Sequence, residues 1–428
     1  MPTRSLFLPF LFLIAGALCG ALAACGGGGS GGASSAATGA AASPATASGA
    51  ASTPGTTGSA ASSPAAIPQS STPNVQPIAV TTAPGLTRNM LTTSVTVCVP
   101  GTSNCATIDN VQVDTGSQGL RLLASALPST LQLPALQAGG GNAGECAVFG
   151  GGYTWGAVRS ADVRMAGQLA AALPVQVIAD PTVPTVPSDC SGAGVAMQSA
   201  ASLRSNGILG VGLFASDCGS TCADNATPRW YYSCDTSGAC QASVQAVAQQ
   251  VTNPVSAFAL DNNGVVIDLP AIGAGGAPSV SGSLIFGIGT QANNVLGEAT
   301  VLRANTQNGY VTTVSNSQTY SLSYLDSGSN ALFIADAGMP ECGLWYCPAT
   351  QQTESATISG SDGATATVSY SVGNATALFN SSDNAFNDLA GISSNSFGWG
   401  LPFFYGRRIY TAIEARLTSA GAGPYYAF

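Results

Sequence analysis

The chain has 428 residues with a formal net charge of −9, and its 11 basic residues are all arginine. It contains no histidine, which excludes a Ser-His-Asp triad, a Cys-His pair and zinc sites built on histidine. Without lysine or any cluster of arginine, the sequence offers no basic surface for nucleic acid. We expect neither a nucleic-acid partner nor a cofactor or bound metal.

Residues 1–24 are predicted to be a signal peptide. Arg4 gives a positive start, and residues 6–18 form an almost unbroken apolar run. Leu22-Ala23-Ala24-Cys25 resembles the lipobox of bacterial lipoproteins, in which Cys25 is lipidated and becomes the first residue. We favour this interpretation because a Gly/Ser-rich tether follows at once. Ordinary secretory cleavage after Ala23 and an uncleaved membrane helix are the alternatives.

Residues 25–84 are predicted to be a lipid-anchored, disordered linker. Up to about Gln76 they are almost entirely Gly, Ala, Ser, Thr and Pro, which cannot bury enough apolar surface to offset the entropy of ordering the chain. The folded body is expected to start near Thr82. We therefore expect an exported protein whose lipid anchor holds it to a membrane of the bacterial envelope. Gly26, directly after the anchor, favours the outer membrane.

Ten cysteines follow Cys25, an even number that indicates disulfides in an exported chain. Three pairings are expected from position: Cys98–Cys105 across a Pro-Gly turn, Cys342–Cys347, and Cys146–Cys190. The other four cysteines, for which a four-thiolate zinc site is the alternative to disulfide bridges, are at 218, 222, 234 and 240.

The secondary-structure signal is β. Short runs that are β-branched or alternate in polarity, separated by Gly, Pro, Asn and Asp, predict strands at 94–97, 111–113, 163–165, 175–178, 265–267 and 283–286. The best helix candidate is 242–251. Many short strands with frequent turns indicate an all-β fold of the sandwich or barrel kind.

One motif occurs twice. Asp114-Thr115-Gly116-Ser117 recurs as Asp326-Ser327-Gly328-Ser329, and each copy ends an apolar, strand-like run. A single copy is typical of an Asx-type turn. Two copies that meet at a pseudo-twofold axis would place two carboxylates side by side, and such a pair shares one proton over a broad pH range. One carboxylate can then accept a proton from water while the other donates to a carbonyl oxygen. A hydroxyl from Ser117 or Ser329 can hold the outer oxygen of each carboxylate.

Segments around both motifs resemble those of pepsin-type aspartic proteases. They are 206–212, 282–287 and the closing segment 399–414, in the order and rough spacing of that family. The resemblance implies an all-β, two-lobed architecture with pseudo-symmetric lobes at 85–292 and 293–428 and a cleft that binds a peptide or protein substrate. It also implies catalytic residues Asp114 and Asp326 and supporting residues Thr115, Gly116, Ser117, Ser327, Gly328 and Ser329. The chain is similar, too, to an uncharacterised proteobacterial lipoprotein family, domain-of-unknown-function family 3443.

Several positions depart from the pepsin pattern. The tyrosine of that family's β-hairpin flap falls on Phe149, and Tyr153 is the other flap candidate if the glycine run shifts the hairpin. Arg121 replaces an aromatic residue after the first motif, and Pro402 replaces a glycine beside the second. The sequence thus predicts an exported aspartic-type endopeptidase. The alternatives are a non-catalytic pepsin-fold binding or inhibitory lipoprotein and a structural envelope lipoprotein.

Overall fold

The structure is a computed structural model, and it describes residues 71–428. The predicted signal peptide, Cys25 and most of the predicted linker lie outside the described residues. The linker prediction is wrong at its C-terminal end, because Val75–Val80 forms β1 and pairs along its whole length with β13 (Val280–Phe286). Within the described part of the chain, no helix is long and apolar enough to cross a membrane.

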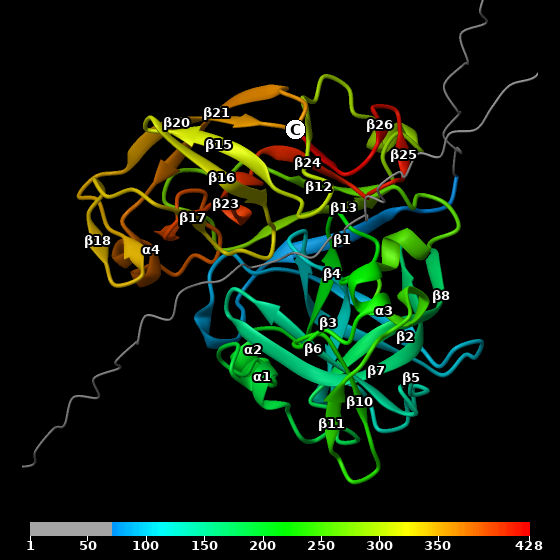
Figure 1. The fold of residues 1–428 in the computed structure, drawn as a ribbon. Coiled ribbons are helices and arrows are strands. Elements are labelled where there is room, and N and C mark those ends of the chain that lie inside the picture. The colour runs from blue at the N-terminus through cyan, green and yellow to red at the C-terminus, as the bar shows by residue number, and fades with distance from the viewer. Residues whose placement is uncertain (1–70) are drawn as a thin grey trace, which may run out of the picture.

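Most strands belong to one sheet of 16 strands (Figure 1). Listed across the sheet, they are β11 (Cys240–Ala242), β10 (Tyr231–Cys234), β6 (Gly141–Phe149), β7 (Gly152–Met165), β8 (Gln168–Ile178), β4 (Gln118–Leu123), β9 (Gly207–Val211), β3 (Cys105–Asp114), β2 (Leu91–Cys98), β1, β13, β12 (Gly264–Leu269), β24 (Arg407–Ala412), β27 (Tyr425–Ala427) and β14 (Val301–Arg303), with β5 (Gln137–Ala138) beside β6. The six predicted strand segments all lie inside these strands, and the prediction of a mostly β fold is confirmed.

Part of this sheet closes on itself. β7 pairs with β2 as well as with β8, so β7, β8, β4, β9, β3 and β2 form a closed circuit. Closure removes the free strand edges that would otherwise need protection. The interior is apolar, and β9 is buried at every residue. This explains why residues 207–211 carry no polar alternation in the sequence.

A second sheet has nine strands. Listed across the sheet, they are β18 (Glu341–Cys342), β19 (Trp345–Tyr346), β22 (Ala390–Ile392), β17 (Leu332–Ile334), β23 (Phe397–Trp399), β16 (Gln318–Leu325), β15 (Val311–Ser315), β20 (Gln352–Ser359) and β21 (Thr365–Val372). A two-stranded ribbon is formed by β25 (Leu417–Thr418) and β26 (Gly421–Ala422). Figure 1 shows β15, β16, β20, β21 and β23 on one side of the molecule and β2 to β11 on the other, with β1, β12, β13 and β24 between them.

The same pairing scheme occurs in both sheets. β9 lies between β3 and β4, parallel to the first and antiparallel to the second. β23 lies in the same way between β16 and β17. The outer neighbours correspond too, since β4 is parallel to β8 and β17 is parallel to β22. The repeated sequence motif therefore lies in a repeated strand arrangement.

Helices are few and short. The α-helices are α1 (Ser188–Ser191), α2 (Ala200–Leu203), α3 (Ser220–Asp224) and α4 (Ala375–Asn380), and the 3-10 turns are η1 (Pro84–Leu86), η2 (Ala124–Ala126), η3 (Val247–Gln249), η4 (Pro254–Ala257), η5 (Ala292–Asn294) and η6 (Leu401–Phe403). The helix prediction at 242–251 is wrong. The Gln250 side-chain amide donates to the carbonyls of Gly219 and Gln245, and these bonds hold the segment against the neighbouring loop in an irregular conformation.

The ten cysteines of residues 71–428 form five disulfides. The three expected pairings are confirmed. The remaining four cysteines form Cys218–Cys222 and Cys234–Cys240, so the zinc alternative is wrong.

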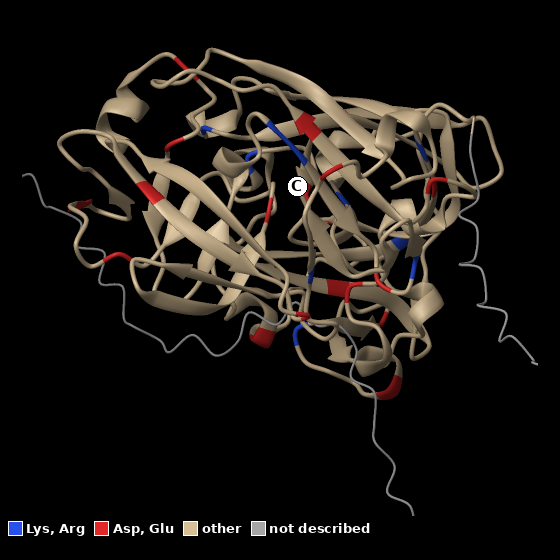
Figure 2. Cartoon of the chain, turned by 90° about the horizontal axis from the view of Figure 1, so that it is seen from above, with Lys and Arg blue, Asp and Glu red and all other residues tan. Residues whose placement is uncertain are grey.

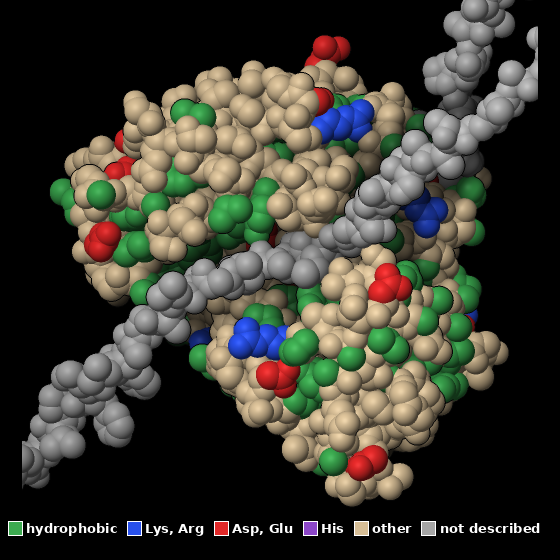
Figure 3. Space-filling model, in the orientation of Figure 1, with side chains coloured by type: hydrophobic (Ala, Val, Ile, Leu, Met, Phe, Trp, Pro, Cys, Tyr) green, Lys and Arg blue, Asp and Glu red, His purple; other side chains and the backbone are tan. Residues whose placement is uncertain are grey.

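Figure 2 shows the charged residues scattered over separate elements, and Figure 3 shows a largely uncharged face.

Candidate active site

Both predicted aspartates occupy the same place in the repeated scheme. Asp114 is the last residue of β3, and Asp326 directly follows β16. The segment that follows the inserted strand bonds to each loop: the N–H of Gly212, just after β9, donates to the carbonyl of Ser117 at 2.9 Å. The N–H of Leu401 donates to the carbonyl of Ser329 at 2.8 Å. Two equivalent loops are thus fixed in equivalent orientations.

The two carboxylates have matched hydrogen-bond donors. Asp114 accepts from the N–H of Gly116 at 2.8 Å and from the Ser117 hydroxyl at 2.5 Å. Asp326 accepts from the N–H of Gly328 at 2.7 Å and from the Ser329 hydroxyl at 2.7 Å. In each case the N–H bonds Oδ1 and the hydroxyl bonds Oδ2, which confirms that the serines can hold the outer oxygens. Asp114 and Asp326 are also hydrogen-bonded to each other, so the two carboxyl groups lie side by side.

Small residues allow this close approach. A Cβ atom placed on Gly116 would lie 2.6 Å from Cγ of Asp326, and one placed on Gly328 would lie 2.5 Å from Oδ1 of Asp114. Real Cβ contacts are longer, so any side chain at either position would push the loops apart. The two loops are also tied together, because the hydroxyl of Thr115 donates to the carbonyl of Leu325 at 3.2 Å. The hydroxyl of Ser327 donates to the carbonyl of Val113 at 2.8 Å.

The electrostatics of the pair favour a shared proton. Asp114 is 7% exposed, while Asp326 is half-buried and Gly116 is exposed, so the pair borders solvent. Burial, the neighbouring Asp326 charge and a hydrogen bond with Asp326 raise the pKa of Asp114 well above its usual value. Ser117 and the Gly116 N–H oppose this rise by stabilising the carboxylate. The two carboxyls can share one proton and bind another polar group between them.

The closing segment packs against the second loop. The N–H of Asp326 donates to the carbonyl of Trp399 at 2.9 Å. A Cβ on Gly400 would lie 2.0 Å from the carbonyl oxygen of Ala331, so this glycine permits the close contact. Pro402 lies at the start of the short turn η6, where its fixed φ and missing N–H are tolerated. The substitution of proline for glycine at this position therefore leaves the loop of Asp326 intact.

The predicted flap region is a β-hairpin of β6 and β7, in which Phe149 pairs with Gly152 at the turn. Phe149 is half-buried, and the Arg121 guanidinium lies over its ring, 5.7 Å from the ring centre. Tyr153 is only 6% exposed and packs in a cluster with Cys146, Trp155 and Cys190. Tyr153 is therefore not an exposed residue of the hairpin turn, because its ring packs in this cluster.

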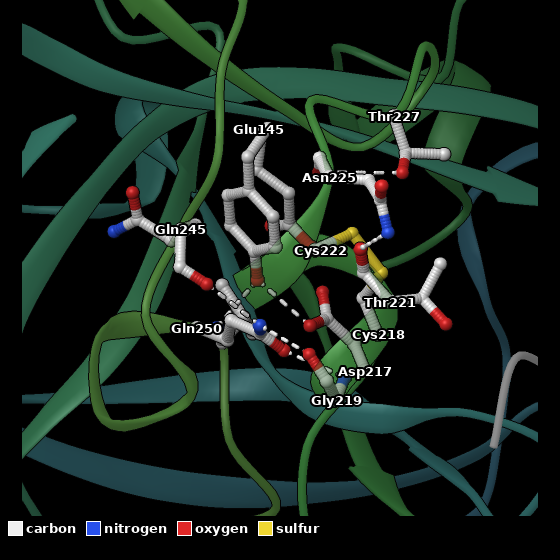
Figure 4. The surroundings of a disulfide bond; sticks show 12 residues. Glu145, Asp217, Cys218, Gly219, Thr221, Cys222, Asn225, Thr227, Gln245 and Gln250 are labelled. Atoms are coloured by element: carbon white, nitrogen blue, oxygen red, sulfur yellow. Dashed lines mark hydrogen bonds between the residues drawn. A yellow bond between two sulfur atoms is a disulfide. The ribbon is translucent and has the colours of Figure 1, made fainter. Parts of the chain in front are cut away.

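Sequence reasoning missed a buried charged cluster behind the first loop. Arg121 on β4 contacts Glu145 on β6 at 2.5 Å and Asp217 at 3.2 Å, and all three side chains are almost fully buried. Tyr231 donates to Asp217 at 2.7 Å. Figure 4 shows Glu145 and Asp217 beside the Cys218–Cys222 disulfide. The only feature of the sequence that could have indicated this cluster is the presence of its charged residues in a chain with few charged residues.

One further polar contact at the dyad and one nearby tyrosine were not foreseen. The amide of Gln112 donates to the carbonyl of Gly328 at 2.8 Å, which links β3 to the second loop. Tyr324 lies near the second carboxylate, and burial together with the Asp326 charge raises the pKa of Tyr324 to about 12. Among residues 71–428, no group of three or more His, Cys, Asp or Glu residues is arranged to hold a metal ion.

A comparison with protein families matches residues 70–428 to the family described as "Protein of unknown function (DUF3443)". The match covers the body, including both aspartate loops, the hairpin and the closing segment. A comparison with curated proteins finds no match.

Proposed function

The chain belongs to the DUF3443 family, whose description gives no activity, and from the geometry of its own site we propose that it is an exported aspartic-type endopeptidase. Asp114 and Asp326 are the catalytic residues. The substrate is a peptide or protein bound between two lobes of pepsin-like architecture, with a water molecule between the carboxyls as nucleophile.

The observation that carries the proposal is the pair of carboxylates with matched donors and a shared face. In the first step the ionised carboxyl takes a proton from water as the water oxygen bonds to the peptide carbon, and the protonated carboxyl gives its proton to the carbonyl oxygen. In the second step the C–N bond breaks as the protonated carboxyl gives its proton to the leaving nitrogen and the ionised carboxyl takes one from a hydroxyl of the tetrahedral intermediate, so the pair again holds one proton. Ser117 and Ser329 keep the two carboxylates oriented throughout.

The repeated strand arrangement supports the two-lobed part of the proposal. β3, β9 and β4 around Asp114 correspond to β16, β23 and β17 around Asp326. We assign residues 85–292 and 293–428 to the two lobes, with the dyad at the boundary between them. The hairpin of β6 and β7 is the flap of the first lobe and covers the bound peptide.

Five disulfides support export, because such bridges persist in oxidising compartments. The proposal adds a signal peptide at 1–24 and a lipid anchor on Cys25 in the outer membrane. Cys25→Ser should move the protein from the membrane fraction to the soluble periplasm or medium, with Cys19→Ser as the matched control. Membrane fractionation unchanged in Cys25→Ser would rule out the anchor.

A peptide-library digestion tests the activity. The mature wild-type chain and three single variants are incubated with the library from pH 3 to 7, with and without pepstatin. The variants are Asp114→Asn, Asp326→Asn and the control Asp362→Asn. Asp362 lies in the exposed turn between β20 and β21. We expect cleavage by the wild type and the control only, blocked by pepstatin. A folded wild type that cuts nothing across this range would overturn the proposal.

One observation favours a second function, a non-catalytic binding or inhibitory lipoprotein. The residue at the hairpin turn is Phe149, which has no hydroxyl to contribute to the site. The same library decides between the two functions: peptides that bind and are recovered uncut would support the binding protein, and cut peptides would exclude it.

A further inference from the structure

Arg121 connects the first aspartate loop to the hairpin of β6 and β7. One terminal nitrogen, Nη1, donates to the carbonyl of Gln118 at 2.6 Å, next to Ser117, whose hydroxyl holds Asp114. The other, Nη2, contacts Glu145 on β6 at 2.5 Å. The central carbon of the guanidinium lies over the ring of Phe149, at the end of the same strand, 5.7 Å from the ring centre. A single side chain thus contacts both the loop and the hairpin.

The two hairpin contacts are on one face of β6. Glu145 and Phe149 are four residues apart, and residues at this spacing point to the same side of a strand. Arg121 therefore holds β6 at its middle through charge and at its end through the aromatic ring. Asp217, directly before the Cys218–Cys222 disulfide, approaches the same nitrogen, Nη2, at 3.2 Å.

Charge balance explains how the Arg121 guanidinium can be buried here. A buried cation is costly unless it is paired and hydrogen-bonded. Two carboxyls face one cation here, so the cluster is neutral when one carboxyl keeps its proton. Burial and the nearby Glu145 charge raise the pKa of Asp217 well above its usual value, which favours Asp217 as the carboxyl that keeps the proton. Tyr231 on β10 also faces the cluster, and it donates to Asp217.

We infer that Arg121 is a positioning residue that fixes the Phe149 end of the β6–β7 hairpin relative to the Asp114 loop. The inference rests on the proposed function for its catalytic meaning, because the hairpin matters to catalysis only if it covers a substrate. Arg121 is buried and touches no reacting atom; it acts through Phe149 and Glu145. Its loss frees the hairpin turn without displacing the aspartates, which are held by their own loops.

The test measures hairpin mobility directly by amide hydrogen exchange of the mature chain. Arg121→Met is compared with Arg121→Lys and with Arg159→Met. The last is a matched control, because Arg159 also lies on the hairpin, on β7, and pairs with Asp180 at 2.5 Å, but it is seven residues beyond Gly152. We expect amides 146–154 to exchange at least about tenfold faster in Arg121→Met, with Arg121→Lys intermediate and Arg159→Met unchanged. Amides of β20 and β21 should stay unchanged in all three.

A folded Arg121→Met with unchanged exchange at 146–154 would overturn the inference, as would an equal loosening in Arg159→Met. If Arg121→Met does not fold, Phe149→Leu decides, since it removes the ring and keeps the charges. We expect faster exchange at 146–154 in Phe149→Leu, and an unchanged rate there would also overturn the inference.

Kinetics give the second readout. With a cleaved peptide, Arg121→Met should raise KM at least about tenfold with kcat changed less than about threefold, because the hairpin contacts substrate while the dyad is intact. Arg121→Lys should recover part of the KM effect, and Arg159→Met should show none. If the wild type cuts no peptide, the proposed function fails, while the exchange result still decides the role of Arg121.

Discussion

Thr115 and Ser327 bond to each other in both directions. The N–H of Thr115 donates to Oγ of Ser327 at 3.1 Å, and the N–H of Ser327 donates to Oγ1 of Thr115 at 2.9 Å. Each hydroxyl then donates to a carbonyl of the opposite loop. All four bonds are buried, so the relative position of the two aspartates is set by the residues that follow them.

The first prediction concerns these bonds. Thr115→Val keeps the shape of the side chain but leaves the buried N–H of Ser327 without its acceptor. We expect the free energy of unfolding to fall by about 1–3 kcal/mol, measured by urea denaturation. The control is Thr96→Val, whose hydroxyl bonds Thr107 at an exposed position and should matter little. Equal effects of the two variants would show that the cross-loop bonds add nothing.

The second prediction concerns the glycines of the motif. Gly116→Ala would place a Cβ 2.6 Å from Cγ of Asp326, and the carboxyls must separate. We expect loss of cleavage and destabilisation by about 1–3 kcal/mol, as for other overpacked sites. Gly150→Ala is the control, because no atom lies within 4 Å of its Cβ position. Retained activity in Gly116→Ala would mean that catalysis does not need the close pair.

The third prediction concerns the pH profile. In the proposed mechanism the pair is active with one proton, and burial and the Asp326 charge raise the pKa of Asp114, so that proton persists to higher pH. Cleavage should therefore rise from very low pH, reach a maximum on the acid side and fall as the last proton leaves. The Asp114→Asn/Asp326→Asn double variant should lose little more activity than either single variant. A rate that keeps increasing toward alkaline pH would contradict a shared-proton mechanism.

The fourth prediction separates the two flap candidates. Phe149→Tyr adds a hydroxyl at the hairpin turn, and Tyr153→Phe removes one from the buried disulfide cluster. If Phe149 occupies the flap position, the first variant should raise kcat/KM by about tenfold, the value of one good hydrogen bond. The second should leave kcat/KM within about twofold. The reverse pattern would assign the flap to Tyr153.

The fifth prediction concerns Asp217, whose pKa burial and Glu145 raise in the folded protein. Because this pKa is higher in the folded than in the unfolded state, the contribution of Asp217 to stability is full below the unfolded pKa. It is lost as pH rises through the folded pKa. Each tenfold change in proton affinity is worth about 1.4 kcal/mol. Asp217→Asn stays neutral, so its stability relative to wild type should increase between pH 4 and pH 7 in thermal unfolding.

Asp180 provides the opposite control. Burial raises its pKa, but hydrogen bonds from Arg159 and Thr182 outweigh burial and lower it. Its contribution to stability is therefore present above the unfolded pKa and is lost as pH falls through the folded one. Asp180→Asn should cost more at pH 7 than at pH 3. Parallel pH trends for the two variants would contradict both assignments.

Local patterns predicted six strand segments, the two aspartate loops and the disulfides Cys98–Cys105 and Cys342–Cys347, because each depends on residues close in sequence. The Arg121 cluster could not be predicted, since its carboxyls come from 24 and 96 residues away and meet only through strand pairing. β1 was hidden by the Gly/Ser-rich composition around it. The helix predicted at 242–251 does not form, because hydrogen bonds from the Gln250 side chain to a neighbouring loop outweigh the helical periodicity of the sequence.

The position of β1 has a consequence for the order in which the protein folds. Just before β1, Asn74 bonds the carbonyl of Phe286, 212 residues away, and the sheet then continues through β12 and β24 to β27 near the C-terminus. Closing so long a loop is slow, and strand edges stay exposed until it happens. A nascent chain that ends before β24 would leave one edge of β12 unpaired and prone to aggregation. This sheet is therefore completed only after β27 has been synthesised.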